Sequence, residues 1–262
     1  MQATEVKLRD SMGQARPPHQ TSIKNVNLRL TVPDKTLKYI LYQRTDCQKI
    51  PFGDRLFSID KLFGGKLYKS AVALQTGLQP DQIRKQYSAI ITHEYSVIEP
   101  YLPREARVVA DVGCGVGGLD VFLSRHYGGK AELYLVDRTE VQDRIYYGFK
   151  PHGAFYNSLS AAKSLLVQNG VEEPRIHLID ARVEDLSTIR NVDLCISLLS
   201  WGFHYPVDTY SETVKKFMKK GGVLILDVKK GTGGETELHN TFHGRAQTIM
   251  ETPNRSRVLV SV

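Results

Sequence analysis

A run of apolar residues that ends in an acid and is followed by four glycines has the residue types needed to bind a nucleoside. The run starts at Val108 and ends at Asp111, and glycines follow at 113, 115, 117 and 118. Glycine adopts positive φ readily and has no side chain, so the backbone of such a turn can approach a ligand closely. The amphipathic segment 119–127 comes next, and a helix starting there offers free N–H groups and the positive end of its dipole. The order of strand, turn and helix predicts a nucleoside-bearing cofactor at this turn.

The elements that position this turn follow from hydrophobic periodicity. Strands are expected at 107–111, 131–137, 175–180, 192–199 and 223–228, and helices at 119–127, 157–169 and 209–220. Near-continuous apolar strands between amphipathic helices indicate a parallel sheet covered on both faces. Segments 246–251 and 257–262, joined by Pro253 and Asn254, predict an antiparallel hairpin. We therefore expect an α/β, Rossmann-like, mostly parallel sheet of seven strands that closes with this C-terminal hairpin.

Composition divides the chain into three parts. Residues 1–35 contain few apolar positions and are expected to form a flexible or extended N-terminal arm. Residues 36–102 have apolar side chains at helical spacing, for example Leu56, Ile59 and Leu62, and predict a helical cap on the substrate side. Residues 103–262 are expected to form the cofactor-binding domain.

Charge and cysteine content exclude some classes of protein. The net charge of +7 allows an anionic partner, either a small molecule or, less favoured, a nucleic acid, although a generic basic surface explains it as well. There is no apolar run of about 18 residues, so we expect no membrane span, and the N-terminus has no secretory apolar region. Cys47, Cys114 and Cys195 lack metal-site spacing, so we expect reduced thiols in a cytoplasmic protein without a metal site. The oligomeric state is not determined by these features.

The glycines alone leave two cofactors open. Gly113, Gly115 and Gly118 also match the dinucleotide fingerprint, so a nicotinamide-dependent oxidoreductase is an alternative. However, Asp111 would repel a pyrophosphate at this turn, whereas it would attract an ammonium or another cationic centre. The predicted C-terminal hairpin also replaces the second parallel half of a dinucleotide-binding fold. Both observations disfavour the nicotinamide reading.

Residues 108–262 carry several motifs in an order that resembles the class I S-adenosylmethionine-dependent methyltransferases. The matching motifs, in chain order, are Asp111 to Gly117, Asp137 after the second strand, Asp180 and Ala181 after the third, Ser197 to His204 after the fourth, and Gly221 with Gly222 before the fifth. The resemblance implies a Rossmann-like methyltransferase of the small-molecule type, with S-adenosyl-L-methionine as its cofactor.

The resemblance also implies roles for individual residues. Asp111 would orient the methionine end of the cofactor, directly or through water. Asp137 lies 24 residues after Gly113 and would accept hydrogen bonds from both ribose hydroxyls. Asp180 would accept from the adenine amino group, with the Ala181 backbone beside the ring. The complete set expected at the cofactor is Asp111, Gly113, Gly115, Gly117, Asp137, Arg138, Asp180, Ala181 and Ser197.

His204 is the candidate general base for a hydroxyl acceptor, because the ordinary pKa of histidine suits proton removal near neutral pH. A packing or orienting histidine is an equally open reading. The other candidate substrate contacts are Tyr87, His93, Tyr147, Trp201 and Tyr205. The aromatic residues after the fourth strand suit an apolar wall or the core, and His93 suits a solvated helix face. The long segment 138–156, which holds Tyr147, suits a lid.

The acceptor class follows mostly from elimination. No Asn-Pro-Pro-Tyr motif follows the fourth strand, no paired acids suggest a metal-assisted catechol type, and Cys195 lies inside a strand. Transfer to a hydroxyl of a small molecule, such as a sugar or a natural product, remains as the favoured reading. The alternatives are an RNA or protein methyltransferase of the same fold and a non-catalytic module built on it.

Overall fold

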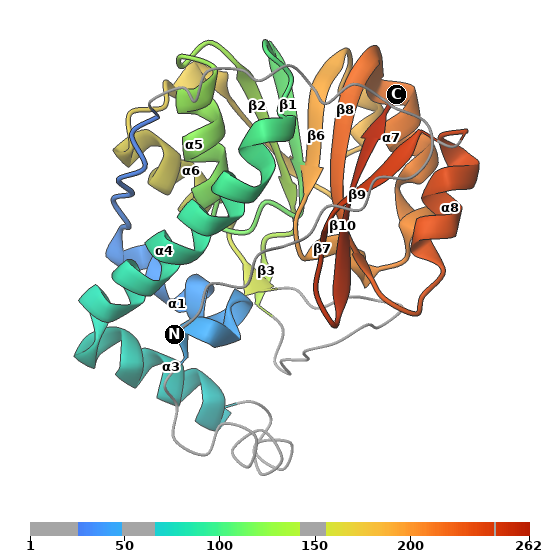
Figure 1. The fold of residues 1–262 in the computed structure, drawn as a ribbon. Helices are drawn as coiled ribbons and strands as arrows, with labels where there is room; N and C mark the ends of the chain where they lie inside the picture. Colours follow the sequence, from blue (N-terminus) through green and yellow to red (C-terminus); the bar gives the residue numbers. More distant parts are fainter. Residues whose placement is uncertain (1–25, 49–65, 142–155, 244) are drawn as a thin grey trace, which may run out of the picture.

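A seven-stranded sheet forms the centre of the molecule (Figure 1). The computed structural model describes residues 26–48, 66–141, 156–243 and 245–262. The strands of the sheet are β1 (Val108–Val112), β2 (Glu132–Asp137), β5 (Ile176–Asp180), β6 (Val192–Ser197), β8 (Met218–Lys229), β9 (Ala246–Glu251) and β10 (Arg255–Ser261).

The strands lie in the order β5-β2-β1-β6-β8-β10-β9. The first five are parallel to one another, whereas β10 is antiparallel to both β8 and β9. β2 and β5 follow on one side of β1, whereas β6 and the later strands lie on its other side. The strand order therefore reverses between β1 and β6. Open α/β sheets bind ligands beyond the carboxyl ends of the strands at such a reversal. The predicted seven-stranded, mostly parallel sheet with its closing hairpin is confirmed.

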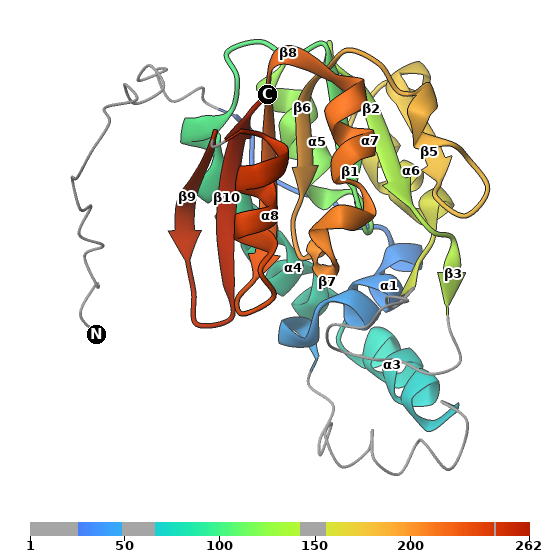
Figure 2. The same cartoon turned by 90° about the vertical axis from the view of Figure 1, so that its right-hand side faces the viewer.

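Helices cover both faces of this sheet (Figures 1 and 2). The helices of the described residues are α1 (Asp34–Gln43), α3 (Lys66–Leu78), α4 (Pro80–Ile98), α5 (Gly118–His126), α6 (Leu159–Gln168), α7 (Ser211–Phe217) and α8 (Gly234–Thr241). Alternate strand residues point to opposite faces. Val109 therefore packs in one core with Phe122 of α5, and Ala110 packs in the other with Phe217 of α7.

The predicted helical cap corresponds to α1, α3 and α4. Ile40 of α1 and Ile91 of α4 belong to the same core as Val109, so these helices pack directly on the central sheet. Residues 26–33 of the predicted arm contain neither helix nor strand. Thr31 exchanges hydrogen bonds of 2.9 and 2.7 Å with Asn169, which fixes this stretch against the end of α6. The boundaries at 35/36 and 102/103 stay predictions.

The prediction of a helix over 209–220 is wrong for residues 218–220, which belong to a strand. α7 ends at Phe217 and β8 begins at Met218. This stretch forms a strand because it pairs with Val262. Gly221 N donates to Val262 O at 2.6 Å, and Val262 N donates to Gly222 O at 2.9 Å. A helical continuation would leave these groups without their sheet partners.

The sequence patterns did not predict several short elements. These are α8, β7 (Ser200–Tyr205) and the small sheet of β3 (Glu140–Val141) and β4 (Tyr156–Asn157). Tyr147 and most of the expected lid 138–156 lie outside the described residues. None of the helices in the described part of the chain has the length and apolarity to span a bilayer. The same residues contain no group of three or more His, Cys, Asp or Glu placed to hold a metal ion.

Candidate active site

A cavity of about 740 Å³ opens at the carboxyl ends of β1, β2 and β6. Figure 2 shows α1 below these strand ends, and α4 and the C-terminal hairpin supply further parts of the wall. Many of the residues predicted from the sequence meet here. Those that line the cavity are Tyr87, Asp111, Gly113, Gly115, Asp137, Arg138, Ala181, His204 and Tyr205.

The glycine turn forms the floor of the cavity and needs its glycines. Gly113 has φ +85° and Gly115 has φ +58°, a region that side chains disfavour. A Cβ at Gly113 would collide with the side chain of Ser200, and one at Gly115 would lie 2.6 Å from Oε1 of Gln43. The turn therefore brings bare backbone to the cavity, as predicted for a ligand that must approach closely.

Two residues that the sequence analysis missed fix this turn. Asn157 Nδ2 donates to Gly115 O at 2.6 Å, and Gln43 Nε2 donates to Asn157 Oδ1 at 3.1 Å. Asn157 is buried. The last residue of α1 is thereby linked through β4 to the turn, so α1 and the cavity floor form one hydrogen-bonded unit.

Asp137 lies beside the turn at the end of β2. Its Oδ2 accepts from Gly115 N at 2.9 Å and its Oδ1 from Arg138 N at 2.6 Å. Burial raises the pKa of Asp137 to about 6, and these hydrogen bonds limit the rise. Each carboxylate oxygen has a second lone pair. The ionised group can therefore accept hydrogen bonds from a diol while its orientation stays fixed.

Asp111 is hydrogen-bonded to a second buried acid, Asp120, in the first turn of α5. Burial raises the pKa of both carboxyls, and the charge of Asp120 raises that of Asp111 further. Oδ2 of Asp120 is buried without a hydrogen-bond partner. A pair of carboxyls that shares one proton keeps a single negative charge under the turn, which favours a cationic group above it.

Three residues predicted at the cofactor lie elsewhere. A Cβ at Gly117 would lie 2.5 Å from Cδ1 of Leu166, so this glycine serves helix packing rather than the cavity. The carboxylate of Asp180 pairs with Arg182 at 2.7 and 3.0 Å, and this pairing holds its pKa below the usual range. Ser197 is fully buried. Its Oγ donates to Val112 O at 2.6 Å and accepts from Trp201 N at 2.9 Å, which ties β6 to β1 and β7.

Two candidate substrate contacts also lie away from the cavity. Trp201 is fully buried and its Nε1 donates to Val207 O at 2.8 Å, so it belongs to the core. His93 is on the exposed side of α4. Tyr87 does line the cavity, where its hydroxyl lies so close to Gly118 that a Cβ on that glycine would be 2.4 Å from it.

The far end of the cavity is built by β7 and the hairpin. Gly202 has φ +83°, and a Cβ on it would lie 2.7 Å from Asp227 O, so β7 packs closely against β8. This approach brings Phe203, His204 and Tyr205 into the wall. The ring of His204 meets that of Phe203 edge-on at 5.2 Å. Basic residues, namely Lys229, Lys230 and Arg255, line the same end.

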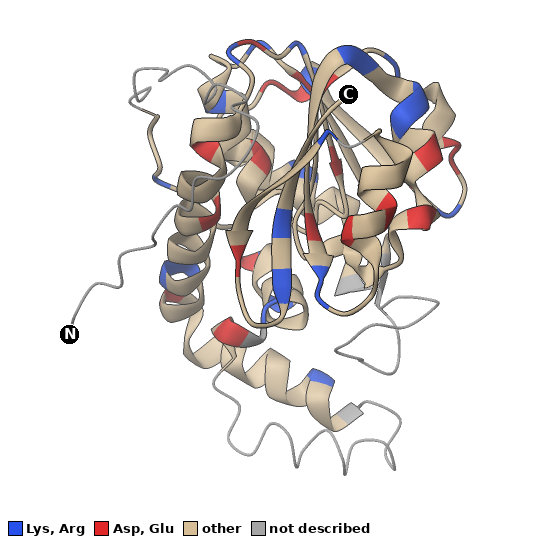
Figure 3. Cartoon of the chain, turned by 45° about the vertical axis from the view of Figure 1, so that its right-hand side comes forward, with Lys and Arg blue, Asp and Glu red and all other residues tan. Residues whose placement is uncertain are grey.

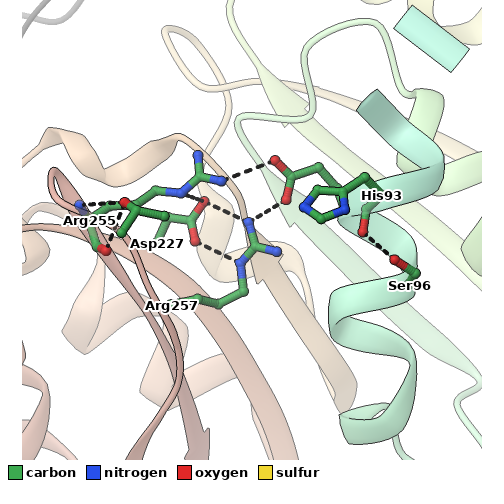
Figure 4. Close-up of polar contacts among 7 residues, drawn as sticks. His93, Ser96, Asp227, Arg255 and Arg257 are labelled. Carbon is green, nitrogen blue, oxygen red and sulfur yellow. Dashed lines mark hydrogen bonds and ion pairs between the residues drawn. The ribbon is translucent and has the colours of Figure 1, made fainter. Parts of the chain in front are cut away.

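A buried network of four charges joins α4 to the hairpin at this end (Figure 4). Nη2 of Arg257 lies 2.6 Å from Oε2 of Glu94, and its Nε lies 2.7 Å from Oδ1 of Asp227. Nη2 of Arg255 lies 3.2 Å from Oε1 of Glu94. Burial opposes ionisation of Glu94, but the two arginines hold its pKa below the usual value. No local sequence pattern indicates this network, because Glu94 and Arg257 are 163 residues apart.

The known proteins that this chain resembles are only distantly similar to it. No protein-family model matches the chain. It is 25% identical over 162 residues to the probable protein arginine N-methyltransferase 6.1 of Oryza sativa subsp. indica, an alignment that covers 60% of this chain and 35% of that protein. The same-named protein of subsp. japonica matches equally, at 25% identity over 60% of this chain and 34% of its own length. The chain thus spans about a third of the length of these relatives.

Solved structures with similar folds include a putative O-methyltransferase from Nostoc punctiforme, with TM-score 0.46 and 15% identity over 69% of this chain and 59% of that one. A 16S rRNA N2 G1207 methyltransferase of T. thermophilus, solved with AdoMet and guanosine, has TM-score 0.45 and 15% identity over 65% of this chain and 42% of that one. Strand order and register within the chain itself define its fold, which is the Rossmann-like, mostly parallel seven-stranded sheet with a closing hairpin that the sequence predicted.

Proposed function

We propose that the chain is an S-adenosylmethionine-dependent methyltransferase that methylates a hydroxyl of a small molecule. One observation carries the proposal: the glycine turn, Asp111, Asp137 and His204 line a single cavity at the carboxyl edge of the sheet. The sequence relatives named above are methyltransferases, which supports the same reaction class. Cys47, Cys114 and Cys195 are free thiols, which supports a reducing, cytoplasmic location.

The residues of the cavity fit this cofactor. Gly113 and Gly115 leave room for close backbone approach, and Asp137 presents a fixed carboxylate for the ribose hydroxyls. The Asp111–Asp120 pair supplies one negative charge for the ammonium group, and Ala181 lies in the wall where the base would pack. When bound, the cofactor supplies an activated methyl group on a positively charged sulfur.

The chain must then position the acceptor and remove its proton. His204 lies in the cavity wall next to Tyr205, so a hydroxyl held there would donate its proton to an imidazole nitrogen as the oxygen takes the methyl group. The Phe203 ring against His204 restricts the imidazole orientation. Ser197 and Trp201 act indirectly, because they hold β7 against β6 and β1.

The test has two stages. Calorimetry with S-adenosylhomocysteine should show one site, and thermal shift should show stabilisation by that ligand but not by NAD(H) or NADP(H), which would exclude the nicotinamide alternative. Turnover is then measured with S-adenosylmethionine on a panel of sugars and phenols. His204→Ala should bind S-adenosylhomocysteine normally and lose about 100-fold or more in kcat. Unchanged turnover would remove His204 from the role of base, and cofactor binding without turnover on any acceptor would favour a non-catalytic module.

A protein arginine acceptor is the second candidate, because the relatives in Oryza sativa are named for that reaction. A guanidinium acceptor needs carboxylates near the methyl position. The cavity end beside His204 instead carries Lys229, Lys230 and Arg255, and both oxygens of Glu94 already pair with arginines. An arginine-rich peptide and an RNA oligonucleotide belong in the acceptor panel, and methylation of either one alone would replace the small-molecule proposal.

A further inference from the structure

Arg44 brings a positive charge to the cavity at the end of α1. It is the first residue after this helix, where its backbone N donates to Ile40 O at 2.8 Å and its carbonyl accepts from Cys47 N at 3.1 Å. Its neighbour Gln43 is hydrogen-bonded to Asn157, which in turn holds the glycine turn. The backbone of Arg44 is therefore fixed beside the turn, and the residue lines the cavity.

The charge of Arg44 acts on groups around the start of α5. Burial raises the pKa of Asp111, and the positive charge of Arg44 opposes this rise. Burial also raises the pKa of Tyr87, and Arg44 opposes that rise as well. The hydroxyl of Tyr87 lies against Gly118, the first residue of α5. The guanidinium is therefore within electrostatic reach of the place where β1 passes through the glycine turn into α5.

Within the described part of the chain, the half-buried guanidinium of Arg44 makes no hydrogen bond or ion pair. The carboxylates nearby have other partners. Both oxygens of Glu94 pair with other arginines, and the carboxyl of Asp111 is hydrogen-bonded to that of Asp120. Asp46 also lines the cavity, but it is exposed. A planar fork of N–H donors is thus left facing the cavity, and this fork matches a carboxylate of a ligand.

Two opposite charges therefore border the same end of the cavity. The Asp111–Asp120 pair keeps one negative charge, and Arg44 supplies one positive charge. Figure 3 shows acidic and basic positions intermixed on α4 and on the C-terminal hairpin, so these elements present no continuous face of one sign. Individual charges rather than a broad field then select the ligand group. A zwitterion, with an ammonium and a carboxylate on one carbon, matches the two charges.

We propose that Arg44 binds the α-carboxylate at the amino acid end of S-adenosylmethionine, while the Asp111–Asp120 pair attracts the ammonium group on the same carbon. This inference rests on the proposed function, because it assigns a further residue to the same cofactor. Two parallel N–H···O bonds from one guanidinium fix the orientation of a carboxylate as well as its charge. Arg44 thereby selects a zwitterionic nucleoside, and it takes no part in proton transfer.

The experiment compares two ligands by calorimetry at constant pH and ionic strength. One is S-adenosylhomocysteine, and the other is its decarboxylated analogue, which keeps the adenosine, the sulfur and the ammonium group. The wild-type chain should bind S-adenosylhomocysteine about 30-fold more tightly, because the analogue lacks the carboxylate that Arg44 binds. Arg44→Gln should weaken S-adenosylhomocysteine binding about 30-fold. The analogue is a net cation, so Arg44→Gln should bind it as tightly as the wild-type chain or more tightly.

Two further variants serve as controls. Arg44→Lys keeps the charge but loses the planar fork, so its affinity for S-adenosylhomocysteine should lie between those of the wild-type chain and Arg44→Gln. Lys38 is an exposed cation on the same helix, with its Nζ 4.9 Å from the centre of the Tyr39 ring and away from the cavity. Lys38→Gln should leave both affinities within about twofold of the wild-type values. Equal weakening of both ligands in Arg44→Gln would show a purely structural role and would overturn the proposal.

The same titrations separate failure of this inference from failure of the proposed function. If the wild-type chain binds neither ligand, the cofactor assignment is refuted, and the role of Arg44 is refuted with it. If the wild-type chain binds both ligands equally, or if Arg44→Gln keeps the wild-type affinity for S-adenosylhomocysteine, the cofactor assignment stands and only the role of Arg44 is overturned.

Turnover gives a second readout. With an acceptor that the wild-type chain methylates, Arg44→Gln should raise the KM for S-adenosylmethionine about tenfold or more and leave kcat within about threefold. The reason is that the carboxylate contact is the same in the ground state and in the transition state. This pattern is the reverse of the one expected for His204→Ala, which lowers kcat. A large loss of kcat at an unchanged KM would contradict the assignment of Arg44 to cofactor binding.

Discussion

Asp111 and Asp120 are joined by a side-chain hydrogen bond directly beneath the glycine turn. A hydrogen bond between two carboxyls requires a proton on one of them. Burial, followed by the mutual charge of the pair, raises the pKa of Asp111, and burial raises that of Asp120. A proton shared by the two carboxyls therefore joins the end of β1 to the start of α5.

The first prediction concerns Asp120→Asn and the pH dependence of stability. Because the folded-state pKa of this pair lies above the unfolded value, the folded chain binds more protons between those two values, and stability falls as pH rises through that interval. An amide at 120 can donate to Asp111 without a shared proton. Urea unfolding at pH 8 should show stabilisation by about 1–3 kcal/mol, and at pH 5 the gain should largely disappear. Glu212→Gln, at an exposed site, is the control, and its free energy of unfolding should stay within about 0.5 kcal/mol of the wild-type value at both pH values. A gain in Asp120→Asn that is equal at pH 5 and pH 8 would argue against a shared proton.

The second prediction separates close approach from backbone strain. Gly115→Ala places a Cβ 2.6 Å from Oε1 of Gln43 at a residue with φ +58°. Gly128→Ala is the matched control, because φ is +65° there but no atom lies within 4 Å. Calorimetry should show Gly115→Ala losing about tenfold or more in S-adenosylhomocysteine affinity, while Gly128→Ala keeps wild-type affinity and loses only about 1 kcal/mol of stability. If Gly128→Ala also lost affinity, global strain would explain the result.

The third prediction uses the pKa of Asp137, which burial raises to about 6. Protonation removes the negative charge that favours two hydroxyl donors. Affinity for S-adenosylhomocysteine should therefore be constant above pH 7 and fall as pH drops below about 6. Asp137→Asn should bind weakly throughout, without this pH dependence. Since Asp180 pairs with Arg182, Asp180→Asn should leave the pH dependence of the affinity in place. Loss of that dependence in Asp180→Asn would show that the ribose contact belongs to Asp180 and not to Asp137.

Local signals explain which parts of the site could be predicted from the sequence. Asp111, Gly113 and Gly115 follow an apolar run, and Asp137 ends the next one, so the common edge of parallel strands brings them together. Ser197 also ends a strand, but the alternation of side chains turns it toward β7, which the pattern did not predict.

Tertiary pairing explains the rest. Gln43 and Asn157 meet across 114 residues, and no local pattern links either to Gly115. The helix predicted over 209–220 ends early because the last residue of the chain pairs with Gly221 and Gly222, a competition that amphipathic spacing does not reveal. The end of the cavity formed by β7 and the C-terminal hairpin is assembled almost entirely from such distant pairs.

The fourth prediction concerns that end. Glu94→Gln removes the charge that α4 contributes to Arg257, a side chain that is fully buried and whose Nη1 already lacks a hydrogen-bond partner. Loss of one partner of a buried ion pair costs about 3–5 kcal/mol, because the remaining charge is left poorly compensated. Urea unfolding should show a loss of this size. Glu251→Gln is the control, since its ion pair with Lys230 is exposed and should contribute less than about 1 kcal/mol. A similar small loss for both variants would mean that Asp227 alone compensates Arg257, and that α4 is docked by its apolar residues rather than by charge.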